Sequence, residues 1–256
     1  MYCHLRKIKI LVLLVINVTI FLSIFPVQAN DPWTPCKLFD PGNGQCLRDL
    51  LQNILITGTT EVHGMQRNSL DPYKAKKARI AADSPIMKLN MDFMKVTVTG
   101  LSQSKIVDVV ANNEDKFDLS MKVSRVHVNG IYAMEGRVLV LNLSGKGEFD
   151  VDFANVDVHL TLTTKLVRRD NKPYFEVQRV KSKLKHLGDL NAKFGNLFAD
   201  NQALTDSANT VFNQNWRELI EVMRPVIEES MNSAIVIQAN KILGKFPASQ
   251  MFSDID

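Results

Sequence analysis

The closest approach to a catalytic motif lies in residues 100–104, which read Gly-Leu-Ser-Gln-Ser. This run resembles the G-x-S-x-G turn that exposes a nucleophilic serine above the sheet of a hydrolase, and Ser102 would then attack an ester. The second glycine is missing, and the residues that follow do not predict the helix that such a turn needs. A lipid hydrolase is therefore disfavoured, and ester turnover that disappears in Ser102→Ala would restore it.

The other side chains with catalytic potential do not form a recognisable constellation. No H-E-x-x-H motif is present, and the histidines downstream of residue 30 are scattered: His63, His127, His159 and His186. Residues 145–147, Gly-Lys-Gly, are too short for a phosphate loop and predict a hairpin turn. Asp150, Asp152 and Asp157 alternate as the outer face of a strand does. The sequence therefore predicts no catalytic residue, no metal site, no cofactor and no enzymatic activity.

Residues 1–29 predict a secretory signal peptide. Arg6, Lys7 and Lys9 precede an apolar run from Ile10 to Phe25, and residues 27–29, Val-Gln-Ala, suit signal peptidase. The alternative is a membrane anchor, because the apolar run is long for a signal. Cleavage would leave residues 30–256 as a single secreted domain.

The charge of the chain argues against a nucleic-acid partner. The net charge of +4 is carried mostly by the leader, so the mature chain is nearly neutral. Two clusters of cations remain, at 74–79 and 181–185, and both predict solvated faces.

Two cysteines remain after the leader, Cys36 and Cys46. In an oxidising compartment they predict a disulfide, and closing so short a loop should contribute roughly 2 to 3 kcal/mol. A zinc pair is the alternative, although no further ligand stands at a suitable spacing.

The apolar pattern divides the chain into a helix, a long run of strands and a second helix. A helical period from Cys46 ends at Gly58, and period 2 then predicts strands at 89–100, 117–129, 134–143, 149–166 and 174–194. Two strands change phase, near Phe93 and near Phe153, as β-bulges do, which predicts a strongly curved sheet. At residues 154–155 the alternative is a turn between two short strands.

The last long segment predicts one amphipathic helix. It would begin near Thr205 or Asp206 and end near Leu243, a length of roughly 55 Å. Pro225 falls on its polar side and should bend it with the apolar side inward. The sequence thus predicts an α+β fold in which a highly curved antiparallel sheet is wrapped around a long C-terminal helix.

The order of the motifs resembles the takeout and juvenile-hormone-binding protein family of insects. The resemblance covers the mature chain, and its marks are the short disulfide before the first helix, Ser-Leu-Asp-Pro at 69–72, Gly-Leu-Ser at 100–102, Gly-Ile-Tyr at 130–132, Gly-Lys-Gly at 145–147, Asn-Leu-Phe at 196–198, Phe-Asn-Gln-Asn-Trp at 212–216, Pro225 and Phe-Pro at 246–247. The single cysteine pair is similar to the takeout branch.

The resemblance implies a secreted carrier, found in haemolymph or another extracellular fluid, that encloses a hydrophobic ligand in a tunnel. Its ligand would be a terpenoid hormone such as juvenile hormone, a fatty acid or a similar lipid. Roles in the family range over hormone transport, feeding, circadian output and chemosensation. A monomer, a cell-surface receptor as partner, and no stable membrane insertion after cleavage are further expectations. The alternative is a membrane-surface or lipopolysaccharide-binding protein of related tubular shape, which would use the basic strip from Lys74 to Arg79.

The candidate wall of the tunnel is made of large apolar side chains, each of which could equally be ordinary core. Tyr132 could also donate a hydrogen bond to a ligand ester or epoxide, unless its hydroxyl satisfies backbone. The candidates are Phe93, Met121, Tyr132, Leu141, Phe153, Leu160, Phe175, Phe198, Phe212, Trp216, Ile220, Met223 and Ile227. Separately, Asn142 begins an Asn-Leu-Ser glycosylation sequon near a strand end.

Overall fold

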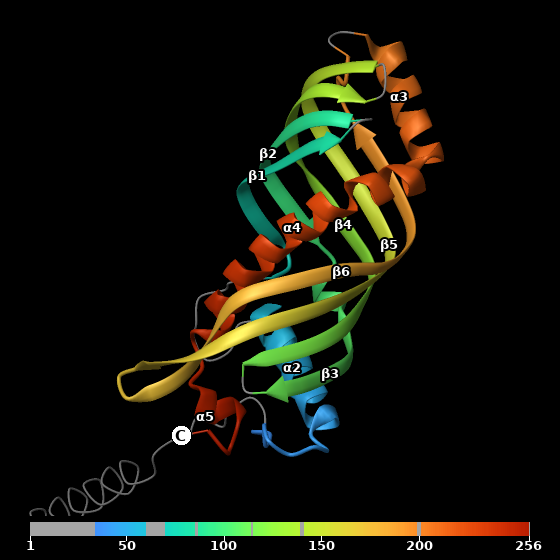
Figure 1. Ribbon diagram of the computed structural model, residues 1–256. Helices are drawn as coiled ribbons and strands as arrows, with labels where there is room; N and C mark the ends of the chain where they lie inside the picture. Colours follow the sequence, from blue (N-terminus) through green and yellow to red (C-terminus); the bar gives the residue numbers. More distant parts are fainter. Residues whose placement is uncertain are drawn as a thin grey trace, which may run out of the picture. The chain divides into compact units, whose positions relative to one another are not determined.

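The computed structural model describes residues 34–59, 70–84, 87–113, 115–138, 141–198 and 201–255. These residues belong to one compact unit, Trp33–Asp256. The predicted leader, 1–29, lies outside them. Within the described ranges a six-stranded antiparallel sheet curves around a C-terminal helix, as the sequence predicts (Figure 1).

The sheet is built mostly from sequential antiparallel neighbours. The strands are β1 (Tyr73–Ser84), β2 (Met87–Thr99), β3 (Lys105–Asn113), β4 (Lys116–Val138), β5 (Leu141–Arg169) and β6 (Lys172–Phe194). The order is β1-β2-β4-β5-β6, and β3 pairs with β4 beyond the region where β2 does. β1 and β6 are therefore the outer strands of this order, β3 forms a further edge beside β4, and α4 contacts both β1 and β6.

Irregular pairing accompanies the curvature. The register of β2 on β4 shifts between Met94 and Thr97, where Lys95 takes a positive φ of 53°, so the predicted bulge near Phe93 is confirmed. At residues 154–155 the alternative of a turn is wrong, because β5 continues through Asn155, whose φ is 53°. The β4–β5 register does not shift there, and the nearest shift of the β5–β6 register is between Asp157 and Val158, so the bulge predicted near Phe153 is wrong at that position. Both strands change the phase of their apolar residues at the same point, so each keeps those residues on the inner face.

Two predicted strand boundaries are wrong. The strands expected at 117–129 and 134–143 are one strand, β4, and the chain reverses between Val138 and Leu141, which pair with each other. The expected hairpin turn at 145–147 instead lies inside β5. A Cβ at Gly145 would stand 2.6 Å from the Asn196 carbonyl oxygen, and one at Gly147 would stand 2.3 Å from that of Gly195. Glycine is required here because another backbone segment crosses the strand closely, not because the chain turns.

The alternation of apolar residues did not predict β1 or β3. β1 is an edge strand with few large apolar residues, and its cations are exposed. The turn between β5 and β6 is a two-residue hairpin, which requires a positive φ at both residues. Asp170 and Asn171 adopt φ of 50° and 60°, and Asp and Asn are residue types that favour such turns.

The first helix, α2 (Gly44–Thr59), agrees with the prediction. The long C-terminal helix does not, because it consists of α3 (Gln202–Gln214) and α4 (Trp216–Leu243), separated at Asn215 and set at a marked angle in Figure 1. α3 begins earlier than predicted: Asn201 is its N-cap and accepts a hydrogen bond from the Leu204 amide. Thr205 is buried, and its hydroxyl accepts from the Phe198 amide.

Two short elements complete the chain, the 3₁₀ turn η1 (Leu101–Gln103) and α5 (Ala248–Met251). Pro225 lies inside α4 and is exposed, which agrees with its predicted place on the polar side. None of the described helices is long and apolar enough to cross a membrane.

Candidate functional site

The space between the inner face of the sheet and α4 contains the candidate wall residues. Twelve of the thirteen candidates belong to the hydrophobic core or pack against it, while the side chain of Leu141 lies outside the described part of the structure. The fully buried candidates are Tyr132, Leu160, Phe175, Trp216 and Ile220. The half-buried ones are Phe93, Met121, Phe153, Phe198, Phe212, Met223 and Ile227.

The half-buried set continues along α4 beyond the predicted residues. Trp216 and Ile220, in the first turns, are the buried apolar side chains of this helix. From Met223 onward the apolar side packs against the core yet keeps part of its surface accessible, and Met231 and Ile235 extend the pattern. The apolar side chains of α4 are therefore fully buried at its start and only half-buried along the rest of its length.

Tyr132 cannot serve as the predicted polar contact to a ligand in this arrangement. Its side chain is 0% exposed, and its hydroxyl donates a hydrogen bond of 2.7 Å to the Gly195 carbonyl oxygen. Burial raises the pKa of Tyr132 to about 12. The hydroxyl therefore fastens the end of β6 to β4, and the backbone alternative weighed above is the one observed.

One aromatic cluster lies at the end of the interior next to α3, and we call it the α3-end cluster. Phe149 contacts Phe93 at 5.0 Å and Phe194 at 6.4 Å between ring centroids. Phe194 also contacts Tyr132 at 5.3 Å and Phe212 at 6.0 Å. Most of these contacts are edge-to-face, which stabilises aromatic pairs beyond their buried area.

A second aromatic cluster, the α5-end cluster, lies at the opposite end of β5 and β6. Its members are Phe117, Phe175 and Phe252, with ring centroids 5.4 to 6.4 Å apart. Figure 1 shows α5 and α3 at opposite ends of the sheet. Aromatic side chains therefore fill both ends of the interior, while aliphatic and methionine side chains line its middle.

The first residues that the structure describes are fastened to the C-terminal tail beside the α5-end cluster. The predicted disulfide joins Cys36 and Cys46, with their Cα atoms 5.8 Å apart. Cys36 also pairs with the tail: its amide donates to Met251, and its carbonyl oxygen accepts from the Ser253 amide.

Asp254 continues this attachment of the tail. Desolvation opposes ionisation of its carboxylate, but the hydrogen bonds accepted from the amides of Leu38 and Phe39 prevail and lower its pKa. The acid is thereby held ionised against the N-terminal segment.

The polar side of α3 and α4 is not simply solvated, which the sequence reading missed. β6 is a sheet edge, and side chains of these helices pair with its free backbone groups. Asn213 forms two bonds of 2.8 Å with the amide and carbonyl of Ala192. The same two-bond arrangement joins Asn209 to Phe194 and Asn240 to Val177. Two further side chains of α4 only accept: Asn232 from the Ser182 amide, and Glu228 from the Leu184 amide.

This pairing continues the sheet by side chains instead of by another strand. A primary amide offers one donor and one acceptor, so an asparagine at the right height can satisfy both groups of a strand residue. The recurrence of polar residues about four positions apart on the side of α4 away from its apolar stripe is the signal that could have revealed it. In the described residues no buried side-chain nitrogen or oxygen lacks a hydrogen-bond partner.

Ser102 takes part in a structural turn. Its hydroxyl donates to Asp71 at 2.5 Å, and the same carboxylate accepts from the backbone amides of Gly100 and Ser102. The chain around Ser102 is the 3₁₀ turn η1 followed by β3, not the helix that a nucleophile turn precedes. This geometry matches a capped turn and lacks the catalytic arrangement of a hydrolase.

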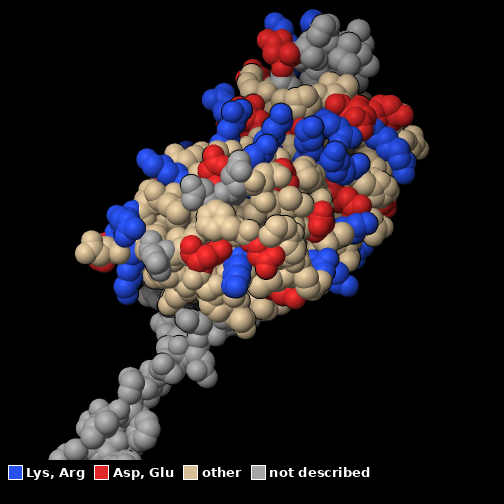
Figure 2. Space-filling view, turned by 60° about the horizontal axis from the view of Figure 1, so that its bottom comes forward, with Lys and Arg blue, Asp and Glu red and all other residues tan. Residues whose placement is uncertain are grey.

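The outer surface carries charges of both signs. Figure 2 shows basic and acidic side chains interspersed over one face. Lys74, Lys76 and Lys77 are exposed on β1, and Arg79 lies 3.5 Å from Asp92 of β2. Beside this pair a shallow pocket of about 430 Å³ is lined mostly by polar side chains, among them Asn90, Glu135 and Lys146.

The chain is similar in sequence to a known family. The family model described as haemolymph juvenile hormone binding protein matches residues 10–253. The circadian clock-controlled proteins named daywake from Drosophila melanogaster and Drosophila yakuba are each 27% identical over 138 residues, which is 54% of this chain and 53% of each relative. The match spans about half the length of these relatives.

The fold is similar to that of Takeout 1 from Epiphyas postvittana. Its crystal structure superposes with a TM-score of 0.70 and 21% sequence identity, covering 85% of this chain and 98% of that one. At this identity the likeness supports the fold alone. The family model, by contrast, matches residues 10–253 of the sequence, and the chain belongs to the haemolymph juvenile hormone binding protein family.

Proposed function

We propose that this chain is a secreted carrier that holds a hydrophobic small molecule between the curved sheet and α4. The observation that carries the proposal is the incomplete burial of the apolar side of α4. The apolar side chains from Met223 to Ile235 pack against the core yet remain half-buried, as do residues of the sheet such as Phe153. A well-packed interior leaves few gaps, so apolar groups that are inward and still accessible are expected to line a binding space.

Burial of apolar surface would supply the affinity. Removing about 300 Å² of a terpenoid or fatty acyl chain from water, at about 25 cal/mol per Å², gives roughly 7 kcal/mol before the entropic costs of binding. The methionines and aliphatic residues in the middle of the interior can adapt to a flexible chain.

The ligand we propose has a long apolar body and little polar recognition. Tyr132, the polar candidate in the predicted wall, already donates to Gly195. Buried side-chain polar atoms in the described part of the chain all have partners within the protein. A ligand hydroxyl or ester would therefore have to displace an existing hydrogen bond, which favours ligands recognised by shape and apolar area.

Filling the proposed space should abolish binding. In Met223→Trp the larger side chain occupies the middle of the interior, and we expect at least a tenfold loss of affinity for a panel of terpenoids and fatty acids. Val222→Trp is the matched control, because Val222 is the neighbouring residue on the exposed side of α4. The wild-type protein, secreted from insect cells, should release a lipid on extraction with organic solvent, identified by mass spectrometry.

Two results would contradict the carrier. One is a secreted protein without an extractable lipid that no member of the panel binds or stabilises against heat. The other is equal binding by the Met223→Trp and Val222→Trp proteins. If the protein instead floats with anionic liposomes and yields no lipid, the membrane-surface alternative gains, since Lys74, Lys76 and Lys77 are exposed on the edge strand β1.

Secretion and glycosylation belong to the same proposal. Asn142 is exposed near the start of β5, where an oligosaccharide could be accommodated. We expect the secreted protein to begin near Asn30 and to lose mass on treatment with an N-glycosidase, whereas Asn142→Gln should not. N-terminal sequencing that finds Met1 or the residues of the leader would contradict cleavage.

A further inference from the structure

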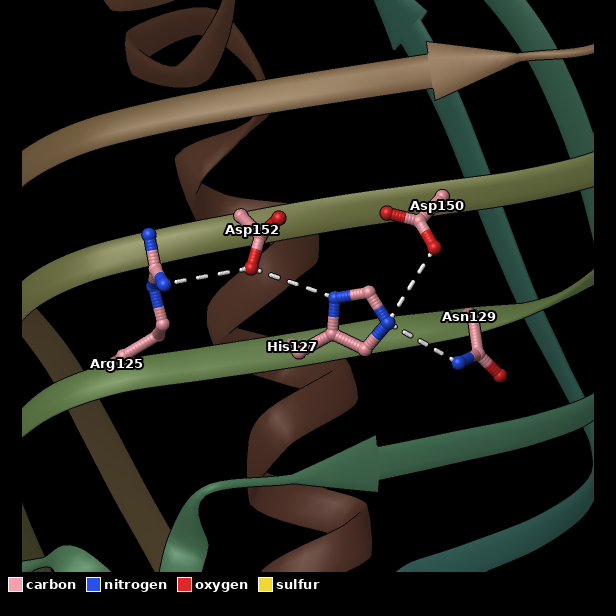
Figure 3. A network of polar contacts seen from close by, with 5 residues as sticks. All are labelled: Arg125, His127, Asn129, Asp150 and Asp152. Atoms are coloured by element: carbon pink, nitrogen blue, oxygen red, sulfur yellow. Dashed lines mark hydrogen bonds and ion pairs between the residues drawn. The ribbon is translucent and has the colours of Figure 1, made fainter.

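Five polar side chains meet on the outer face of β4 and β5, away from the interior. His127 pairs in register with Asp152, and Asn129 pairs with Asp150, so the alternation of the two strands turns all four outward (Figure 3). Arg125 lies beside them, with its Nε 3.9 Å from an Asp152 oxygen. The interior-facing neighbours, Val128 and Val151 among them, belong to the core.

The imidazole of His127 faces a carboxylate at each of its two nitrogens. Nδ1 lies 3.3 Å from Oδ1 of Asp152, and Nε2 lies 3.3 Å from Oδ2 of Asp150. A neutral imidazole has a single N–H. Whichever tautomer is present, one ring lone pair faces a carboxylate oxygen, and that contact is repulsive unless a cation lies between them. The cation could be a proton on the ring or a metal ion.

Asn129 favours one tautomer. Its amide lies 3.1 Å from Nε2, and as oriented it donates a hydrogen bond to that nitrogen. Nδ1 then carries the proton and donates to Asp152, while Nε2 accepts from Asn129 and also lies 3.3 Å from Oδ2 of Asp150. A histidine that donates one N–H to a carboxylate and presents its other nitrogen beside a second carboxylate has the arrangement common among metal-binding histidines.

We propose that His127 and Asp150 bind a divalent transition-metal ion of the Zn²⁺ type, with Asp152 as the residue that orients the imidazole. With metal–ligand bonds of about 2.0 to 2.1 Å, two ligands of a tetrahedral Zn²⁺ ion stand about 3.3 to 3.4 Å apart. The observed separation of Nε2 and Oδ2 is 3.3 Å. An ion on Nε2 would replace the hydrogen bond from Asn129. Rotation of that amide by half a turn would then place its oxygen where its nitrogen now lies and supply a third ligand, and water would complete the set.

The charge and the ligand types of the site agree with such an ion. Arg125 offsets the charge of Asp152, so Asp150 supplies the net negative charge next to Nε2. One imidazole nitrogen with carboxylate and amide oxygens suits zinc and similar metals, whereas Ca²⁺ and Mg²⁺ prefer oxygen ligands alone. The ligand atoms of His127, Asp150 and Asp152 all lie within 4.8 Å of one another, so an ion can enter without moving either strand.

The test is a titration of the purified full-length secreted protein with ZnCl₂, followed by calorimetry, with CoCl₂ as a spectroscopic probe. We expect one saturable Zn²⁺ per chain and a visible Co²⁺ absorption that Zn²⁺ displaces. His127→Ala and Asp150→Asn should abolish both signals. Asp152→Asn should weaken Zn²⁺ affinity by about 10- to 100-fold, as the loss of an orienting carboxylate does.

His159→Ala is the matched control. His159 lies on β5, and its Nε2 is 3.6 Å from an oxygen of Asp118 on β4. It is therefore a histidine on the same pair of strands that faces a single carboxylate. Zn²⁺ binding should be unchanged in this variant. The proposal is overturned if the wild-type protein shows no saturable binding. It is also overturned if binding persists in both His127→Ala and Asp150→Asn, or falls equally in His159→Ala. Ligand extraction from the interior is expected to be the same for all these variants.

Discussion

The two aromatic clusters close the ends of the same interior by different means. At the α5 end, a disulfide, backbone pairing of Cys36 with the tail and the Asp254 carboxylate fasten the segment around Cys36 to the tail beside Phe252. At the α3 end, a 13-residue helix is attached to β6 through the side chains of Asn209 and Asn213, and the Tyr132 hydroxyl separately holds Gly195, just after β6. Covalent and backbone bonds hold one end, and side-chain hydrogen bonds hold the other.

This difference indicates which end opens more easily. Local opening of a protein breaks the segments with the fewest buried contacts and the weakest attachments first. Both clusters mix buried and half-buried rings: Phe175 and Phe252 are buried and Phe117 is half-buried at the α5 end, while Phe149 and Tyr132 are buried and Phe93, Phe194 and Phe212 are half-buried at the α3 end. The clearer difference lies in the attachments, which at the α3 end are side-chain hydrogen bonds. We therefore expect α3 to move away before α5 does, which would make the α3 end the entrance for a ligand.

The largest effect should come from Phe252→Ala. Removing a buried aromatic ring leaves a cavity, and we expect the free energy of unfolding to fall by about 3 to 5 kcal/mol in urea denaturation. Phe212→Ala removes a half-buried ring at the α3 end and should lower it by less, about 1 to 3 kcal/mol. Phe39→Ala is the control, because Phe39 is 61% exposed and its loss should matter little. Equal losses of unfolding free energy for the Phe252 and Phe212 variants would contradict the expected difference between the two ends.

Removal of the disulfide should cause the second-largest loss of unfolding free energy. Replacing Cys36 and Cys46 together by serine removes the constraint on a loop of sequence separation 10, and we expect a loss of about 2 to 3 kcal/mol in unfolding free energy. Hydrogen exchange sharpens the expectation. The amides of Leu38, Phe39 and Ser253 should exchange faster, while that of Ala192 at the other end should not. Faster exchange at both ends would mean that they open as one unit.

The asparagine attachments should have a smaller and local effect. Asn213→Ala leaves the amide and carbonyl of Ala192 without their partner, and we expect a loss of about 1 to 3 kcal/mol with faster exchange at Ala192. Asn240→Ala makes the same change at Val177 along α4. Gln214→Ala, at an exposed neighbouring position, is the control. If α3 is the entrance, Asn213→Ala should also speed ligand release, and Asn240→Ala should do so less.

The smallest effect should be that of Tyr132→Phe, about 1 kcal/mol at neutral pH, because the Gly195 carbonyl loses one hydrogen bond. The folded state raises the pKa of Tyr132 from 10 to about 12, so it retains the proton that the unfolded chain releases. The contribution of Tyr132 is therefore complete below pH 10 and is lost as the pH rises from 10 to about 12. Unfolding free energies measured across this range should fall more steeply for the wild type than for Tyr132→Phe, and parallel curves would contradict the burial of this hydroxyl.

Much of the fold could be predicted because its signals are local. The alternation of apolar residues marks the long strands, the phase change near Phe93 marks a bulge, and the helical period from Cys46 marks α2. β1 could not be found this way, since an edge strand with few large apolar residues carries little alternation. The break at Asn215 was also missed, because the apolar stripe continues across it from Phe212 to Trp216.

The sequence predicted which apolar residues belong to the interior, but not how deeply each one is buried or what role it has. Twelve wall candidates lie in or against the core, since large apolar residues on inward positions are buried in any fold of this kind. Which of them are half-buried depends on how closely α4 approaches the sheet. The role of Tyr132 depends on where residues 195–196 cross β5, which no local pattern encodes.

The sequence by itself determined the class of the fold, the disulfide and the apolar character of the interior, because each follows from residues that are close in the chain or from a repeated period. Only the tertiary structure decided which polar groups meet. Asn213 faces Ala192, and His127 stands between Asp150 and Asp152, because helices cover the free edge of β6 and because β4 pairs with β5 in one register. A shift of one residue in that register would turn the same side chains to the opposite face and remove these contacts.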